Sequence, residues 1–347
     1  MPTLSIPNVR LAGLAAAVPP IEEFSWSEIP DAGHFEITRR RGETPYRRAA
    51  RVEQCQSDLC VDAARALLAE LDWQPSEIAV VIMATLTPDY PIPATAIIVQ
   101  DRLGIPKSAA AFDLPSGSLG FLHGLQVVAS MLSPGSLKKG LLLTGEVSKT
   151  AEASDSSPPH RAIHGHSGSV CALEFSVGAA PLIFDSGGDG ADFDAFYMPV
   201  GGVRQPPRPD MFRDAEGLRL ASDYVLDISR LGGRAHDELP ASMLRVLEAA
   251  GLTSPEVDAC FVSALPLPIE TAIRRGMHLP VDRFHGALAE YGNSGSGTIP
   301  LAMLARHGTR LRRERQVSLL SAMGPGLAWG SALLTTEKIA CPELLEV

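Results

Sequence analysis

The sequence predicts an α/β fold made of two halves with a similar layout. Apolar runs of strand length alternate with helical segments along most of the chain, and this alternation is typical of largely parallel sheets with helices on their faces. The order of elements in the first half recurs in the second, which indicates an internal duplication. We place the two halves at residues 1–176 and 177–347.

In the first half, Ser57 is expected to cap a helix, because apolar residues recur at helical spacing from Leu59 to Leu71. The run 78–84 is continuously apolar, as expected for a strand that is covered on both faces. A Pro-rich loop follows it. Further on we expect a helix, a strand, a helix that begins at Ser118 and a strand, at 94–103, 109–114, 118–132 and 140–145.

The second half repeats this order. We expect helices at 243–250, 269–277 and 298–306, and strands at 259–264, 284–289, 316–322 and 328–335. The intervening segment 178–240 is rich in Gly, Pro and Asp, which favours loops and lids over core elements.

Composition limits the kind of protein this is. With 347 residues, 45% hydrophobic and 20% charged, the chain is typical of globular proteins. No apolar run has membrane-spanning length, and the N-terminus resembles a first strand rather than a signal peptide. Five scattered cysteines favour a reducing, cytoplasmic compartment over disulfides or a zinc site. The net charge of −10 argues against nonspecific nucleic-acid binding.

Ser118 is the first candidate catalytic residue. The segment from Ala111 to Phe121 predicts a short strand, a turn of small residues and a helix, with Ser118 on the turn. Unpaired N–H groups at a helix N-terminus favour negative charge, which suits a nucleophile whose attack creates an oxyanion. A simple helix cap is the alternative role for this serine.

Four motifs in order resemble the 3-oxoacyl-[acyl-carrier-protein] synthase III family: Met83–Ala96, Ala111–Phe121, Tyr291–Ser294 and Leu327–Leu333. The resemblance covers most of the chain from about residue 50. It implies a thiolase-like fold, with two duplicated α/β halves in five layers, α-β-α-β-α, and a homodimer. It also implies the condensation of an acyl-CoA starter with malonyl-acyl carrier protein.

The resemblance also implies a catalytic set of Cys, His and Asn, from which this chain departs. Ser118 stands at the cysteine position and Ala264 at the histidine position, whereas Asn293 is kept. In the C-terminal glycine run, Pro325 brings no backbone N–H to an oxyanion hole. A serine hydroxyl needs a base, and losing one of the two donors that bind the extender should impair decarboxylation.

His164 is the candidate base. It stands where the family has a phenylalanine beside the nucleophile, so an imidazole is expected near Ser118; a loop histidine that bonds only to backbone is the alternative. His166, in the same loop, is open to the same two roles. The remaining histidines are weaker candidates: we expect His123 to be a packing residue, His285 a secondary base and His160 an exposed side chain. Ser116 is a second possible nucleophile, although the motif register favours Ser118.

Substrate contacts are assigned by the resemblance and by charge. Arg39 and Arg40 lie near the expected pantetheine tunnel, in a segment that also holds Arg41, Arg47, Arg48 and Arg51. Guanidinium groups bind phosphates and carboxylates, so this segment, with Arg274 and Arg275, is expected to attract coenzyme A or an acidic carrier protein; a solvated loop is the alternative. Leu226, Met323 and Gly324 are expected to line the acyl site.

These features predict an acyltransferase that loads an acyl group from acyl-CoA or acyl-acyl carrier protein onto Ser118 and passes it to an acceptor. Such an enzyme serves starter-unit priming or tailoring in polyketide or fatty-acid-like biosynthesis. It needs no cofactor or metal beyond its thioester substrate. A catalytically silent subunit of a heterodimeric ketosynthase and an acyl-thioester hydrolase are the alternatives.

Overall fold

The computed structural model describes residues 3–23, 46–148, 164–206, 224–265, 267–286 and 291–347. Most strands of this part of the chain form two six-stranded sheets. The order in the first sheet is β16 (Leu345–Glu346), β2 (Val9–Val18), β8 (Ser167–Phe175), β7 (Lys139–Glu146), β5 (Ile78–Ala84) and β6 (Ala110–Leu114). The order in the second sheet is β1 (Leu4–Ile6), β9 (Leu182–Gly188), β15 (Ala328–Glu337), β14 (Arg315–Gly324), β12 (Ala259–Val262) and β13 (Phe284–His285).

The two sheets share one strand pattern. From β2 to β6 the successive pairs are antiparallel, antiparallel, parallel and parallel, and the same sequence runs from β9 to β13. This repeat is the structural form of the duplication that the sequence predicts. The two short terminal strands each join the sheet formed by the opposite half of the chain: β1 pairs with β9 in the second sheet, and β16 pairs with β2 in the first.

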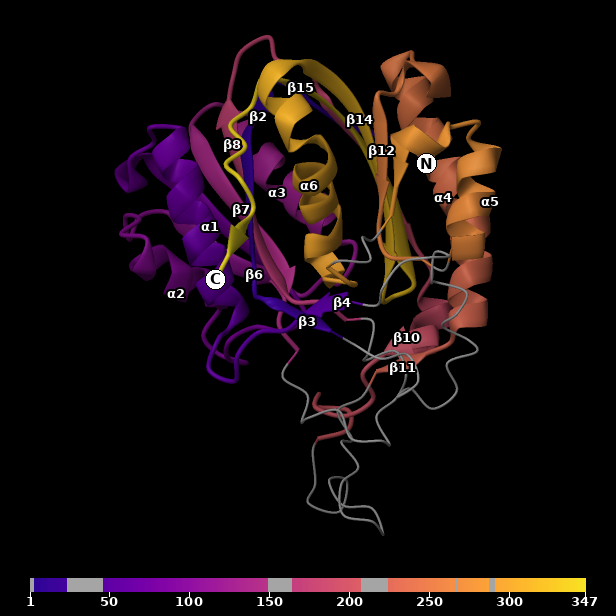
Figure 1. Cartoon of the computed structure of the whole chain (residues 1–347), viewed down its shortest axis with the longest axis horizontal. Coiled ribbons are helices and arrows are strands. Elements are labelled where there is room, and N and C mark those ends of the chain that lie inside the picture. The colour runs from indigo at the N-terminus through magenta and orange to yellow at the C-terminus, as the bar shows by residue number, and fades with distance from the viewer. Residues whose placement is uncertain (1–2, 24–45, 149–163, 207–223, 266, 287–290) are drawn as a thin grey trace.

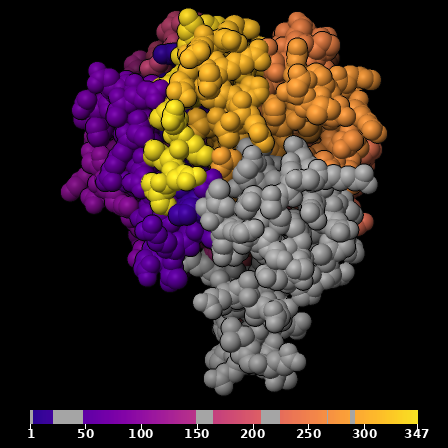
Figure 2. Space-filling model, viewed as in Figure 1, coloured from indigo at the N-terminus to yellow at the C-terminus, as the bar shows by residue number. Residues whose placement is uncertain are grey.

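The helices complete five layers, α-β-α-β-α, as predicted (Figure 1). The outer layer on the first sheet holds α1 (Gln56–Glu70) and α2 (Thr95–Arg102), the central layer α3 (Gly120–Leu132) and α6 (Thr298–Arg313), and the outer layer on the second sheet α4 (Ile228–Ala250) and α5 (Leu267–Gly276). In the space-filling view the C-terminal segment, in yellow, follows the seam between the indigo and orange halves (Figure 2).

The central layer explains the sequence of α3. Its residues are apolar almost all round, and eight of them are buried, as expected for a helix that is covered on every side. Val128, Phe121 and Leu125 belong to one cluster with residues of both sheets and of α6. The start of α3, and with it Ser118, is therefore fixed by contacts from both halves of the chain.

Three sequence expectations are wrong in detail. The sheets are mixed rather than largely parallel, since β7 and β8, and likewise β14 and β15, are antiparallel neighbours in both chain and sheet. Helix α1 begins after Cys55, whose N–H donates to Asp58 at 2.7 Å; the Ser57 hydroxyl instead accepts from Arg102. The segment 178–240 holds β9 and the first half of α4, with Pro240 inside that helix.

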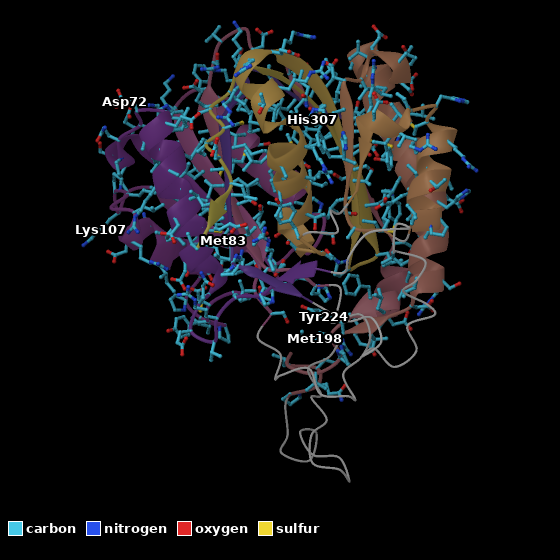
Figure 3. All side chains as sticks on the ribbon, viewed as in Figure 1. Asp72, Met83, Lys107, Met198, Tyr224 and His307 are labelled. Atoms are coloured by element: carbon cyan, nitrogen blue, oxygen red, sulfur yellow. The ribbon has the colours of Figure 1, made fainter. Side chains whose placement is uncertain are left out.

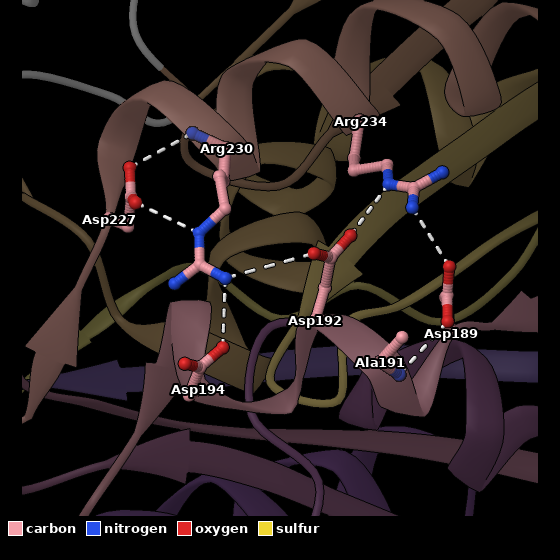
Figure 4. Close-up of polar contacts among 7 residues, drawn as sticks. All are labelled: Asp189, Ala191, Asp192, Asp194, Asp227, Arg230 and Arg234. Atoms are coloured by element: carbon pink, nitrogen blue, oxygen red, sulfur yellow. Dashed lines mark hydrogen bonds and ion pairs between the residues drawn. The ribbon is translucent and has the colours of Figure 1, made fainter.

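An ion-pair cluster marks the start of α4 (Figure 4). Arg230 binds Asp227 and Asp194, and Arg234 binds Asp192 and Asp189, so the helix is tied to the 3-10 turn Gly190–Ala195. Along the chain, the 3-10 turn is followed by β10 (Phe196–Tyr197) and α4 is preceded by β11 (Val225–Leu226), and these two strands pair as a small sheet. A second small sheet pairs β3 (Ile21–Glu23) with β4 (Tyr46–Arg48).

The described part of the chain contains no helix that is both long and apolar enough to span a membrane. The five cysteines form no disulfide bond within the described part of the chain. Within the same residues, no cluster of His, Cys, Asp and Glu is arranged to hold a metal ion.

Candidate active site

The candidate site lies around the turn Ser116–Gly120, which connects the edge strand β6 to α3. Glycines allow other segments to approach this turn closely. A Cβ on Gly117 would lie 2.9 Å from Leu86 Cδ1 and 3.2 Å from Pro325 Cδ, and one on Gly120 would lie 2.9 Å from Ser296 Cβ. The loop after β5, the turn between β14 and β15 and the turn before α6 therefore converge on the start of α3.

Ser118 is partly exposed and precedes the first residues of α3. Its hydroxyl makes no hydrogen bond to any residue in the described ranges, His164 and His166 included. Within those ranges, its backbone N–H and those of Gly117 and Leu119 also have no acceptor. These donors lie where an oxyanion would be stabilised.

Asn293 is held in one orientation by its side-chain oxygen. Oδ1 accepts from the Gly295 N–H at 2.9 Å and from the Thr298 hydroxyl at 3.3 Å. No described residue accepts from Nδ2. Asn293 is therefore a fixed amide with a donor left for a substrate oxygen.

The backbone places His164 beside Asn293. The two residues form a parallel β-bridge, and the N–H of Gly165 donates to the Asn293 carbonyl at 3.0 Å. The ring of His166 is engaged elsewhere, because its Nδ1 accepts from the Ala50 N–H at 2.8 Å. The structure thus brings His164 and Asn293 together, without a hydrogen bond from His164 to the Ser118 hydroxyl.

A different serine on the turn does contact a histidine. The Ser116 hydroxyl lies 3.0 Å from Nδ1 of His123, so His123 is not merely the packing residue that the sequence predicted. Helical side chains point toward the N-terminus of their helix, and His123 in the first turns of α3 therefore covers Ser116. Desolvation by burial lowers the pKa of His123 below its usual 6.5, which keeps the imidazole neutral at pH 7.

Glu146, at the end of β7, is a buried residue that the sequence analysis missed. Its carboxylate accepts from the Thr85 and Thr87 hydroxyls at 2.9 and 2.8 Å and from the Leu86 N–H at 3.1 Å. Burial raises its pKa to about 7, although these hydrogen bonds act in the opposite direction. The sequence did contain a signal for this buried residue: a carboxylate at the end of an apolar strand, together with two threonines in a loop.

Ser296 extends this network to the Asn293 turn. Its hydroxyl donates to the Ala84 carbonyl at 2.8 Å and accepts from the Gly145 N–H at 2.9 Å. The Cα of Gly295 also lies against Glu146, since a Cβ there would be 2.6 Å from Glu146 Cγ. Glu146 and Ser296 therefore fix the relative positions of the loop after β5 and of the turn that carries Asn293.

The predicted acyl-site residues lie in the second half. Met323 is buried, its N–H donates to the Ser263 hydroxyl at 3.3 Å, and Leu226 packs against the same apolar cluster. Gly324 faces the start of α3, because a Cβ there would lie 3.6 Å from the Ser118 nitrogen. Ala264, next to Ser263, is half-buried and offers no polar side chain.

Only some of the arginines that were expected to bind phosphate lie in the described part of the chain. Arg39 and Arg40 lie outside the described residues, as do Arg41 and His160. The expectation that Arg48 belongs to an exposed phosphate-binding segment is wrong, because its side chain is 4% exposed. It binds Glu346 at 2.8 Å, donates to the Pro19 carbonyl and lies over the Tyr291 ring, so it supports the Asn293 turn.

His285 belongs to a separate polar chain in the central layer. Its Nε2 lies 3.0 Å from Nε2 of His307, whose Nδ1 lies 3.0 Å from the side-chain oxygen of Gln316. Both rings pack against Phe261, and Figure 3 labels the half-buried His307 in the region of α6. Because Gln316 Oε1 can only accept, Nδ1 of His307 donates. These contacts involve β13, α6 and β14 rather than the Ser118 turn.

Two duplicated mixed sheets with a layer of buried helices between them are the architecture of the thiolase-like α/β fold. Residues 247–336 match the C-terminal region of 3-oxoacyl-[acyl-carrier-protein (ACP)] synthase III. The chain belongs to the 3-oxoacyl-[acyl-carrier-protein] synthase III family, an enzyme family, and this agrees with the resemblance of its motifs.

Individual relatives support this assignment. The chain is 32% identical over 289 residues to the beta-ketoacyl-[acyl-carrier-protein] synthase III of Pseudomonas aeruginosa, with 81% of this chain and 82% of that protein covered. It is 31% identical over 301 residues to the enzyme of a Roseiflexus species, with 83% and 86% covered. The crystal structure of a 3-oxoacyl-(acyl-carrier protein) synthase from Burkholderia xenovorans superimposes with a TM-score of 0.89 at 26% identity, covering 100% and 99% of the chains.

Proposed function

We propose that the protein is an acyltransferase of the synthase III type that takes an acyl group from acyl-CoA or acyl-acyl carrier protein onto Ser118. The acyl group then passes to an acceptor in starter-unit priming or tailoring. The reaction uses the acyl thioester and the acceptor as its substrates, and no cofactor takes part. The proposal rests on one observation above all: Ser118 is partly exposed at the start of α3, among backbone N–H donors that have no acceptor in the described ranges.

The surroundings of Ser118 favour transfer over carbon–carbon bond formation. Asn293 supplies one side-chain donor, through Nδ2, for the oxygen of a bound thioester. Ala264 supplies none, and removing one donor of this kind typically slows a reaction ~10²–10³-fold. An oxygen, nitrogen, sulfur or water acceptor avoids the decarboxylation that would need both donors.

Intact-mass spectrometry tests this proposal. The protein is incubated with acyl-CoAs and acyl-acyl carrier proteins of increasing chain length. We expect an adduct of the acyl mass that is absent from Ser118→Ala and present in the matched control Ser130→Ala, a change at an exposed serine of α3. If no chain length and no carrier gives an adduct, the acyltransferase proposal is wrong.

Asn293→Asp makes the test more specific. Aspartate keeps an oxygen for the Gly295 N–H and the Thr298 hydroxyl but lacks the Nδ2 donor. We expect adduct formation to slow by ~10²-fold or more in this variant, with the melting temperature close to that of the wild type. An unchanged rate would show that Nδ2 does not contact the reacting thioester.

A catalytically silent subunit is the second candidate. It is favoured by Ala264 and by the absence of a described base on the Ser118 hydroxyl. A silent subunit should co-purify with a cysteine-bearing synthase and give no adduct alone. An adduct on the isolated protein would exclude this role.

The homodimer that the family resemblance implied also stays a proposal. Strand β6 is the edge of the first sheet, and Phe112 on it is 37% exposed. An open edge strand with an exposed aromatic residue is a site for pairing with another chain. We expect light scattering after size exclusion to give a dimer mass, and a monomer mass for Phe112→Asp.

A further inference from the structure

We infer that Ser116 and His123 form a second nucleophilic centre, one that reacts with acyl thioesters and other activated acyl compounds. This inference goes beyond acylation of Ser118 and does not depend on it. It starts from a contact that the described residues form between a serine hydroxyl and a histidine at the candidate site, Ser116 Oγ to His123 Nδ1 at 3.0 Å.

The fold holds this pair in place. The N–H of Ser116 donates to the Leu114 carbonyl at 2.8 Å, which fixes the serine at the end of β6, and the N–H of His123 donates to the Leu119 carbonyl at 3.1 Å. Ser116 and the imidazole therefore sit on a strand end and on a buried helix, rather than on a long loop. Rigid placement of nucleophile and base lowers the entropy cost of reaction.

The imidazole is in the charge state that a base requires. Partial burial, the cause of its lowered pKa, keeps the ring neutral at pH 7, and in the tautomer that carries its proton on Nε2 the Nδ1 atom accepts the proton of Ser116. Nε2 makes no hydrogen bond to the rest of the described chain. The arrangement is thus a serine–histidine dyad without a carboxylate to orient the ring.

Electrophile and oxyanion can both be accommodated at this turn. Ser116 and His123 are each partly exposed, and the three successive N–H groups from Gly117 to Leu119, which lack acceptors in the described chain, follow directly after the serine. An N–H just after a nucleophile is a usual oxyanion donor. Pro325, which has no N–H to offer, packs on Gly117 instead.

The covalent step balances with these groups alone. Oγ of Ser116 bonds to the carbonyl carbon of the thioester while the hydroxyl proton moves to Nδ1 of His123. The carbon–sulfur bond then breaks, and the leaving thiolate takes the proton from Nδ1. The products are the acyl ester of Ser116, a free thiol and a neutral imidazole.

A fluorophosphonate probe tests the inference without knowledge of the natural acyl group. Oγ of an activated serine displaces fluoride from phosphorus, so a label forms only where a base takes the hydroxyl proton. Cleavage after Lys107 and Lys138 gives one peptide that contains both Ser116 and Ser118, and fragmentation of that peptide locates the label. We expect the label on Ser116 of the wild-type protein.

Two variants and the pH profile separate activation from structure. His123→Gln should slow labelling ~10²-fold or more, and Ser116→Ala should remove the label, whereas His236→Gln and Ser130→Ala, both at exposed positions, should not change the rate. Labelling should reach a plateau above the ionisation of His123, itself below 6.5. A serine without a base would keep gaining rate with hydroxide concentration.

The outcomes distinguish this inference from the proposed function. Absence of label, or label on Ser118 alone, overturns the Ser116–His123 centre even when acyl-CoA gives a Ser118 adduct. Label on Ser116 with the expected pH plateau supports it, even when no acyl-CoA adduct forms and the acyltransferase proposal fails.

Discussion

Glu146→Gln is the most direct test of the buried network behind the site. In the wild type one carboxylate holds Thr85, Thr87 and the Leu86 N–H together, and burial raises its pKa from 4.5 to about 7. Glutamine has nearly the same shape but cannot ionise. The threonine hydroxyls can rotate to accept from its amide, so the variant should fold and keep the loop after β5 in place.

The magnitude follows from linkage between ionisation and folding. Because the folded-state pKa of Glu146 is raised, the stabilising contribution of its protonated form is complete below pH 4.5 and is lost as pH rises to about 7. A shift of this size corresponds to about 3 kcal/mol at ~1.4 kcal/mol per pKa unit. Between pH 5 and pH 8 this ionisation should lower the free energy of unfolding of the wild-type protein by about 2.5 kcal/mol.

Urea denaturation at several pH values measures this effect. The free energy of unfolding of Glu146→Gln minus that of the wild type should become more positive by about 2.5 kcal/mol from pH 5 to pH 8. Glu248→Gln, at an exposed position of α4, controls for the loss of one negative charge. Should the two stability profiles for Glu146→Gln and wild type run parallel, the reasoning about a desolvated carboxyl is refuted.

Three further changes probe other contacts. Arg245→Met removes both hydrogen bonds to the buried carboxylate of Asp185 and should lower the free energy of unfolding, measured in urea, by about 3–5 kcal/mol. Adding Asp185→Leu to this variant should restore most of that stability. A loss below about 1 kcal/mol in Arg245→Met would contradict this reasoning. Gly165→Ala would drive a Cβ into the Tyr291 carbonyl oxygen, so calorimetry should show a lower melting temperature, whereas an unchanged value would mean that this turn adapts. Burial lowers the pKa of His307, so the stability that its neutral ring contributes is lost as pH falls below about 6.5. His307→Gln should therefore lose less stability in acid than the wild type. Equal acid sensitivity of the two proteins would contradict the burial of this ring.

The elements that the sequence predicts well are those with a strong local signal. Strand β5 is one continuous apolar run, and α3 is apolar on nearly every face, so both were expected close to their observed bounds. Helix α4 was expected to start at Met243 but begins after Asp227, which caps it by accepting from the Arg230 N–H. Pro240 and neighbouring glycines obscured this helix, which is stabilised by packing on the second sheet.

At the site, too, local motifs predicted where residues lie in the fold, whereas contacts between distant residues were not predicted. Local motifs located Ser118 at the start of α3 and Asn293 on the turn before α6. The sequence predicted His164 beside the Ser118 hydroxyl, whereas the structure shows a backbone bridge from His164 to Asn293. The contact between Ser116 and His123 depends on the direction in which a helical side chain points. The position of Glu146 relative to Thr85 and Ser296 depends on three segments that meet only in the folded chain.

The sequence by itself determined the α/β class through the apolar periodicity of its segments, and the resemblance of four short motifs implied the family and its five layers, because periodicity and motifs are local properties of the chain. Only the tertiary structure decided which hydroxyl lies against an imidazole and which carboxylate loses its water. Hydrogen bonds and desolvation act over a few ångströms, between residues that can be far apart in sequence.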